Sequence, residues 1–125
     1  MKTKLRIRAA GHSLTAQLTT SACAEAIAGI LPIRARAETW GDEVYFDIGL
    51  EAELEAGAAE VVRPGDIGYW PTGRAICLFF GPTPISAPGE IRPASAVNLV
   101  GRITDDATVL KDVADGDEIV IEAAD

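Results

Sequence analysis

The chain has 125 residues, a length typical of one domain that buries roughly two thirds of its unfolded surface. Hydrophobic residues make up 48% of it, as in globular proteins, and no apolar stretch reaches the ~20 residues that cross a bilayer. The formal net charge of −8 disfavours contact with phosphate backbones, so we expect neither nucleic acid nor a membrane as a partner.

The first residues and the cysteines predict where the protein is located and whether it binds a metal. Residues 1–8 alternate basic and apolar side chains, whereas a signal peptide places a continuous apolar block after its charges, so we expect a cytoplasmic protein. Cys23 and Cys77 have apolar neighbours and no second thiol nearby, which predicts reduced, buried thiols. With His12 as the one histidine, the chain cannot assemble a Cys/His zinc site, and we expect no metal and no cofactor.

The N-terminal part of the chain predicts a β-hairpin followed by a helix. Residues 4–9 alternate apolar and charged side chains, as in a half-buried strand, and 14–18 returns in phase after a turn at 10–13. His12 therefore lies at the hairpin tip, where we expect a solvated turn residue. The Ala-rich segment 22–31 has three possible N-caps before it and a proline after it, and this predicts a helix of about three turns.

The middle of the chain predicts further strands. Residues 33–39 and 44–50 alternate as strands around a turn at 40–43, whereas the acidic, Ala-rich segment 51–60 supports no assignment. The apolar runs 67–70 and 75–80 flank Pro-Thr-Gly-Arg, which is typical of a β-hairpin. This hairpin holds four of the seven aromatic residues, and its second run suits a strand covered on both faces or one lining a barrel. We expect the centre of the fold here, with any ligand pocket beside it.

The C-terminal part begins with a proline-rich loop. Four prolines between residues 81 and 94 exclude regular strand pairing and predict a long, stiff, ordered surface loop. Strands at 96–103 and 118–122 and a short helix within 105–113 complete the chain. The acidic residues between 105 and 118 lack the spacing of an EF-hand loop, so we expect solvated turns there. About eight strands, one clear helix and one short helix predict a mainly β fold, closed as a barrel.

Three motifs in order carry a family resemblance. They are TWGDEVYF at 39–46, GDIGYWP at 65–71 and GRAICLFFGPTP at 73–84, and PASAVNLVGRI at 93–103 fits the same pattern. Together they resemble the small prokaryotic cyclophilin-like family over essentially the whole chain. The resemblance implies one domain, residues 1–125, that forms a closed eight-stranded cyclophilin-like β-barrel with helices capping its ends.

The residues that cyclophilins use for prolyl isomerisation are not found at the matching positions of this sequence. Cyclophilins use an arginine beside a phenylalanine and a glutamine, but the matching region, about 40–49, contains neither arginine nor glutamine. In a second isomerase motif Ala75 takes the place of a glutamine and Cys77 that of the pocket phenylalanine, while the site histidine falls near Val97. We therefore expect no catalytic residues of the usual prolyl isomerase set.

Two functions remain as hypotheses. The first is a non-catalytic module that binds a peptide or a small ligand, because tryptophan and tyrosine combine broad apolar contact with a hydrogen-bonding edge. The alternative is a peptidyl-prolyl cis-trans isomerase with atypical residues, in which Arg74 would stabilise the twisted amide. A third interpretation is that the rings simply fill the barrel and its ends. The sequence predicts no oligomeric state, and the candidate ligand-binding residues are Trp40, Tyr45, Tyr69, Trp70 and Arg74.

Overall fold

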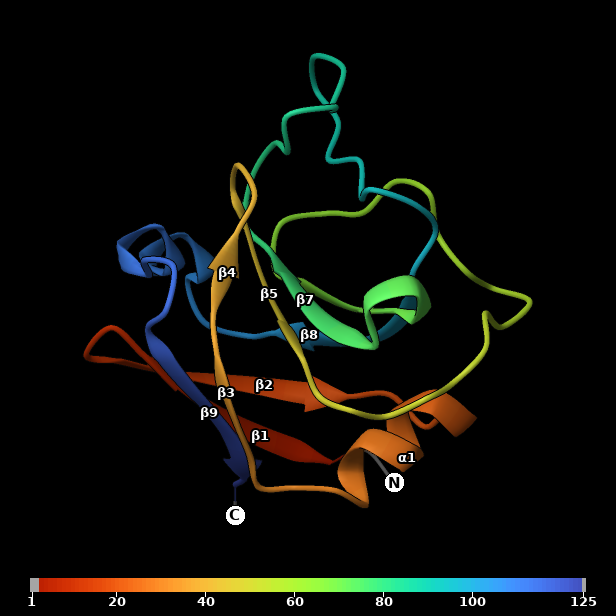
Figure 1. The fold of residues 1–125 in the computed structure, drawn as a ribbon, viewed down its shortest axis with the longest axis vertical. Coiled ribbons are helices and arrows are strands. Elements are labelled where there is room, and N and C mark those ends of the chain that lie inside the picture. Colours follow the sequence, from red (N-terminus) through yellow and green to blue (C-terminus); the bar gives the residue numbers. More distant parts are fainter. Residues whose placement is uncertain (1–2, 125) are drawn as a thin grey trace.

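The structure, a computed structural model, describes residues 3–124, which form a β-barrel built from one nine-stranded sheet (Figure 1). The strand order is β3-β9-β1-β2-β8-β6-β7-β5-β4, and neighbouring strands are antiparallel. The strands are β1 (Lys4–Ala9), β2 (His12–Leu18), β3 (Ile33–Arg36), β4 (Glu38–Thr39), β5 (Glu43–Asp47), β6 (Asp66–Trp70), β7 (Ala75–Phe79), β8 (Asn98–Ile103) and β9 (Glu118–Ala123). The helices are α1 (Ala22–Ala28) and the 3-10 turns η1 (Pro71–Gly73) and η2 (Ala107–Asp112).

A bend at Ala37 closes the barrel. The sequence predicts one strand at 33–39, but the structure divides it into β3, which pairs with β9, and β4, which pairs with β5. Figure 1 shows β3 continuing into β4 between these two neighbours. The Ala37 amide donates to the Asp117 carbonyl and its carbonyl accepts from the Gly116 amide, each at 2.8 Å. Counted as one bent strand, this segment gives the eight-stranded barrel that the sequence predicts.

The barrel interior is the main hydrophobic core, because alternate residues of each strand point inward. Strand β7 is different, since all five of its residues are buried. Ile76 and Leu78 point into the main core, whereas Cys77 and Phe79 point outward into a second, smaller cluster. The prediction of a strand covered on both faces is therefore confirmed. The second cluster also contains Val62, Ile91 and Val97, which come from the loops that cover this outer face.

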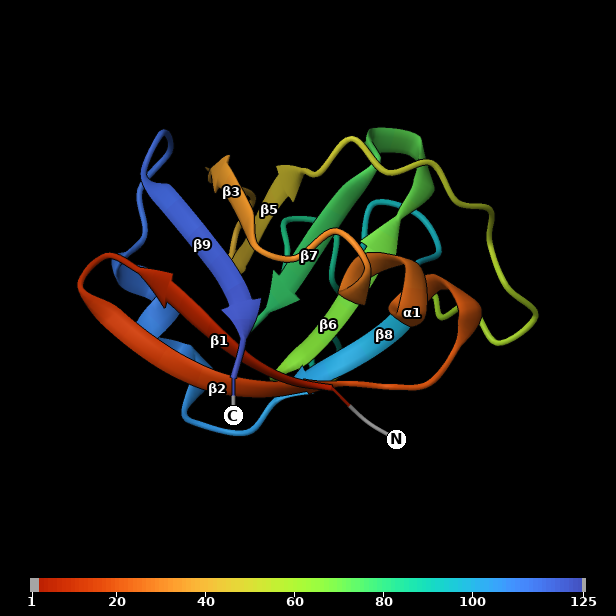
Figure 2. The same cartoon turned by 90° about the horizontal axis from the view of Figure 1, so that it is seen from below.

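Helix α1 lies at one opening of the barrel, and η2 lies on the opposite side (Figure 2). The Ser21 side chain caps α1 by accepting from the Ala24 amide at 3.2 Å. The prediction of a helix over 22–31 is too long, because Gly29 ends it after seven residues and the chain then turns toward Pro32. The buried face of α1 consists of Cys23, Ala24 and Ile27. No helix within residues 3–124 has the length and apolar character needed to cross a membrane.

The turn of the first hairpin is tighter than predicted. Ala10 and Gly11 have positive φ angles and form it alone, so His12 is already part of β2. The His12 ring is half-buried rather than free in solvent, with Nε2 2.9 Å from the Asp112 carboxylate of η2. The hairpin is thus joined to the turn that follows β8.

Hydrogen bonds fix the proline-rich loop, residues 81–97, internally and join it to the segment before β6. The Thr83 hydroxyl donates to the Arg92 carbonyl at 2.5 Å, and the Arg92 amide donates to the Ser86 hydroxyl at 2.9 Å. The Val62 amide donates to the Ile91 carbonyl at 2.9 Å and joins the loop to the segment before β6. These bonds give the loop a defined conformation, as the sequence predicts.

The close approach of β2 and β8 requires a glycine at position 101. A Cβ at Gly101 would overlap the Gln17 carbonyl oxygen of β2, and that backbone has no room to move inside the sheet. We expect Gly101→Ala to lower the free energy of unfolding by about 1–3 kcal/mol, measured by urea denaturation. Gly57→Ala is the matched control, since nothing lies within 4 Å of a Cβ there. Equal stability of the two variants would contradict this packing.

Candidate functional site

The outer face of β5, β7 and β6 carries the candidate site. In the strand register Tyr45 of β5 is opposite Cys77 of β7, and Cys77 is opposite Gly68 of β6. These three residues therefore form a row across the sheet on the side away from the barrel core. A Cβ on Gly68 would lie 2.8 Å from Val97, so the missing side chain is what lets the loop close down over one end of the row.

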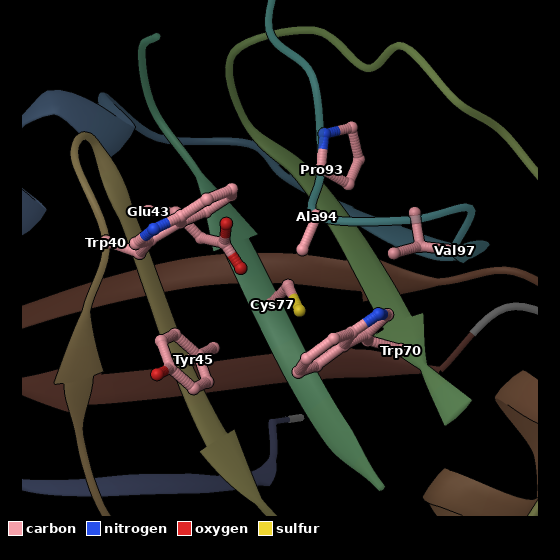
Figure 3. A pocket seen from close by; sticks show the side chains of 8 residues that line it. All are labelled: Trp40, Glu43, Tyr45, Trp70, Cys77, Pro93, Ala94 and Val97. Carbon is pink, nitrogen blue, oxygen red and sulfur yellow. The ribbon is translucent and has the colours of Figure 1, made fainter. Parts of the chain in front are cut away.

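A pocket of about 280 Å³ opens above this row (Figure 3). Its walls are mainly aromatic and aliphatic, and they come from the turn before β5, from all three strands and from the end of the proline-rich loop. We call it the aromatic pocket. Its lining residues are Trp40, Glu43, Tyr45, Trp70, Cys77, Pro93, Ala94 and Val97.

Three contacts fix the Trp70 ring at one side of the aromatic pocket. The indole Nε1 donates to the Ser95 hydroxyl at 2.6 Å. The ring meets Tyr45 edge to face, with ring centroids 6.4 Å apart and an interplanar angle of 86°. A Cβ on Gly73 would lie 2.7 Å from the indole, so the glycine in the β6–β7 turn leaves the space that Trp70 occupies. The ring is thus oriented before any ligand arrives.

Trp40 lies on the other side of the pocket and is held by the turn into β5. Its amide donates to the Glu43 carbonyl at 3.0 Å. The next residue, Gly41, has φ +60°, and a Cβ there would lie 2.8 Å from Pro84. This turn and the proline-rich loop therefore pack directly on one another, and the loop positions both tryptophans.

Among the described residues, Glu43 is the one carboxylic acid that lines the pocket. Its residue surface is only 5% exposed, and Oε1 has no hydrogen-bond partner among the described residues. None of the ion pairs within residues 3–124 includes it. Figure 3 shows the carboxyl group turned in between Trp40 and Cys77. A polar atom buried without a partner costs free energy, and such atoms in folded proteins call for an explanation.

Burial changes the acidity of both titratable groups at the pocket floor. It raises the pKa of Glu43 to about 7 from an ordinary value of 4.5. A hydrogen bond from the neighbouring Cys77 thiol lowers the pKa by a smaller amount. Burial, followed by the charge of Glu43, raises the pKa of Cys77 well above its usual value. A neutral buried thiol is a poor nucleophile, so this arrangement suits binding better than covalent chemistry.

The structure brings together three of the five residues that the sequence singles out. Trp40, Tyr45 and Trp70 line one pocket, as described above. Tyr69 alternates with Trp70 and is fully buried in the main core, where its hydroxyl donates to the Leu50 carbonyl. Arg74 lies outside the pocket, with half of its side chain exposed and its guanidinium 3.4 Å from the Asp47 carboxylate.

Sequence reasoning missed Glu43 and two of the loop residues that complete the pocket. The predicted strand begins at 44 and leaves Glu43 in a turn, although β5 begins at Glu43 itself. A strand starting one residue earlier would have placed Glu43 and Tyr45 on one face. The contribution of Pro93 and Ala94 depends on how the loop folds, and no spacing in the sequence indicates that, whereas the family resemblance already matches Val97 to a site position.

The acidic residues near the C-terminus act as turn and cap residues. Asp105 accepts from the Thr15 amide at 2.7 Å, Asp106 caps η2, and Asp115 accepts from the Thr39 amide at 2.7 Å. Within residues 3–124, no group of three or more His, Cys, Asp or Glu side chains is placed to hold a metal ion. Both cysteines are free and buried, as predicted.

Comparisons with known proteins agree with this architecture. The family model for cyclophilin-like proteins matches residues 3–122. The solution structure of the hypothetical protein AF2241 from Archaeoglobus fulgidus is 45% identical and superposes with a TM-score of 0.81, covering 98% of this chain and 95% of that one. A comparison with curated proteins gave no match. The chain belongs to the cyclophilin-like family, and the resemblance seen in its motifs is confirmed.

The raised pKa of Glu43 makes stability depend on pH. Between its unfolded value of 4.5 and its folded value of about 7, the folded protein holds the extra proton. The stability that Glu43 contributes is therefore complete below pH 4.5 and is lost as the pH rises through 7. We expect the stability advantage of Glu43→Gln over the natural chain to grow by about 2–3 kcal/mol between pH 5 and pH 8.

Urea denaturation of both chains at the two pH values measures this difference. The matched control is Glu38→Gln, an exposed glutamate on the neighbouring strand β4, for which the pH-dependent difference should stay within about 0.5 kcal/mol. A stability difference for Glu43→Gln that is the same at both pH values would show that Glu43 is ionised normally.

Proposed function

We propose that this protein is a non-catalytic binding module that holds a small ligand, or one side chain of a peptide, in the aromatic pocket. The observation that carries the proposal is the pocket itself, in which two tryptophans and a tyrosine surround an open volume of about 280 Å³. This volume lies just below the range for drug-sized ligands, about 300–1,000 Å³, and suits a small ligand. Apolar walls with one placed polar group are typical of such sites.

The preorganisation of the pocket supports binding. The Ser95 hydroxyl, the Tyr45 ring and the space at Gly73 hold Trp70 in place. A ligand would therefore bind without ordering this ring first, which lowers the entropic cost of association. The position of the pocket adds support, because Cys77 and Val97 line it and are the residues that the family resemblance matches to the isomerase pocket.

The structure gives less support to the alternative, an atypical prolyl isomerase. None of the eight residues lining the pocket is an arginine or a glutamine, and Arg74 is directed toward Asp47. Cyclophilins place such side chains beside the twisting amide. We expect a protease-coupled assay on a prolyl peptide to give the rate of buffer alone. Acceleration above that rate, lost in Arg74→Ala, would support the isomerase instead.

Binding can be followed through the tryptophans, because the chain has two and both line the pocket. We expect proline-containing peptides or small apolar amides at millimolar concentration to change tryptophan fluorescence and the two indole N–H signals in NMR spectra. Replacing the ring in Tyr45→Leu should weaken binding about tenfold, corresponding to a contact of roughly 1–1.5 kcal/mol, and the variant still contains both tryptophans as reporters.

Arg74→Ala is the control for this experiment. The sequence predicts Arg74 as a ligand-binding residue, but the structure places it outside the pocket. We therefore expect its replacement to change ligand affinity less than twofold. Binding that depends on Arg74 and not on Tyr45 would move the site away from the aromatic pocket. Unchanged fluorescence and unchanged indole signals with every probe would contradict the binding function.

A further inference from the structure

The aromatic pocket combines two features that point to the charge of its ligand. Its walls present the ring faces and edges of Trp40, Tyr45 and Trp70, and its floor presents a buried carboxyl oxygen without a partner. Aromatic rings attract cations through the negative charge of their faces, and attraction is strongest where water is excluded. A buried carboxylate is stabilised by an opposite charge that also donates a hydrogen bond.

Within residues 3–124, no side chain lining the pocket supplies that positive charge. Strand β7 contributes Cys77 and strand β5 contributes Tyr45 beside Glu43, whereas Glu38 of β4 lies outside the lining and its negative charge acts on Tyr45. The proline-rich loop contributes only Pro93, Ala94 and Val97 to the walls. The titratable groups that line the pocket with Glu43 are therefore the Tyr45 hydroxyl and the Cys77 thiol, and no lysine or arginine of the described part of the chain lines it.

We propose that the aromatic pocket binds an alkylammonium cation whose N–H donates to Oε1 of Glu43 while its alkyl groups contact Trp40, Tyr45 and Trp70. This inference rests on the proposed binding function and names the ligand class. A secondary or tertiary ammonium group meets both requirements, since it offers an N–H donor and apolar substituents together. The net charge of −8 further favours the approach of cations.

The cation can belong to a free small amine or to a methylated lysine of a peptide, because both offer the same group. The pocket is open to solvent and Ala94 at its margin is exposed, so either source has access. Dimethylaminoethanol and a short peptide carrying dimethyllysine serve as the two probes. Tighter binding of the peptide would identify a peptide ligand, and equal affinity would identify the ammonium group alone as the determinant.

The test compares dimethylaminoethanol, which is protonated at pH 8, with its uncharged isostere 3-methylbutan-1-ol. The two indole N–H signals and tryptophan fluorescence report binding to the pocket. We expect at least tenfold tighter binding of the cation. Choline, which lacks the N–H, should bind more weakly than dimethylaminoethanol.

Acidification provides a second arm that needs no mutation. Glu43, with a pKa of about 7, must be ionised to pair with the cation, so affinity should fall roughly 100-fold from pH 8 to pH 5. Affinity that rises instead would mean that protonated Glu43 donates to a neutral ligand, and it would overturn the proposal. This arm stays decisive even if a variant fails to fold.

The variant arm uses Glu43→Gln, with Glu38→Gln as the matched control for loss of one negative charge. We expect at least tenfold weaker cation binding in the first and less than threefold in the second. Binding of the alcohol as tight as that of the cation, unaffected by Glu43→Gln, would overturn the ligand class and leave the binding function standing. If neither indole N–H signal changes with the charged, the uncharged or the proline-containing probes, the binding function is contradicted as well.

Discussion

Strand β7 is buried on both faces, and the rest of the site depends on that constraint. Ile76 and Leu78 complete the barrel core, so Cys77 and Phe79 have to be covered from outside. The chain covers them with the segment around Val62 and with the proline-rich loop. Apolar surface removed from water in this way contributes roughly 25 cal/mol per Å². The aromatic pocket is the part of this outer face that the two segments leave open.

Glu43 is the unusual residue in the part that stays open. A glutamate that is 5% exposed and whose carboxyl group has an unpartnered oxygen lowers stability at neutral pH. Glycines at 68 and 73 meanwhile let Val97 and Trp70 take positions that a side chain would block. A buried polar atom without a partner calls for an explanation, and the cation proposed above would supply the missing partner. The cyclophilin-like barrel provides the rigid frame, and the turn at 40–42 and the loop at 81–97 provide the pocket.

The sequence predicted the barrel well because its signals are local. Alternation in 4–9, the apolar run 75–80 and the glycine and proline turns between strands each depend on near neighbours in the chain. The bend at Ala37 was missed because it is set by barrel closure, which pairs β3 and β4 with strands remote in sequence. Tyr69 and Trp70 appeared equivalent as aromatic neighbours, yet strand alternation sends one to the core and the other to the pocket. The burial of Glu43 depends on a loop that folds over it from some forty residues away, which no local pattern records.

The ionisation of the Glu43 carboxyl group decides both how much the pocket lowers the stability of the fold and which ligand it is proposed to bind. The most direct measurement is an NMR titration of the Glu43 side-chain carboxyl carbon, made on the free protein and again with a saturating alkylammonium ligand. We expect a pKa near 7 in the free protein and a clearly lower value in the complex, because a bound cation stabilises the ionised form. Titration near 4.5 in the free protein, or a pKa that is the same with and without the cation, would contradict the central claim.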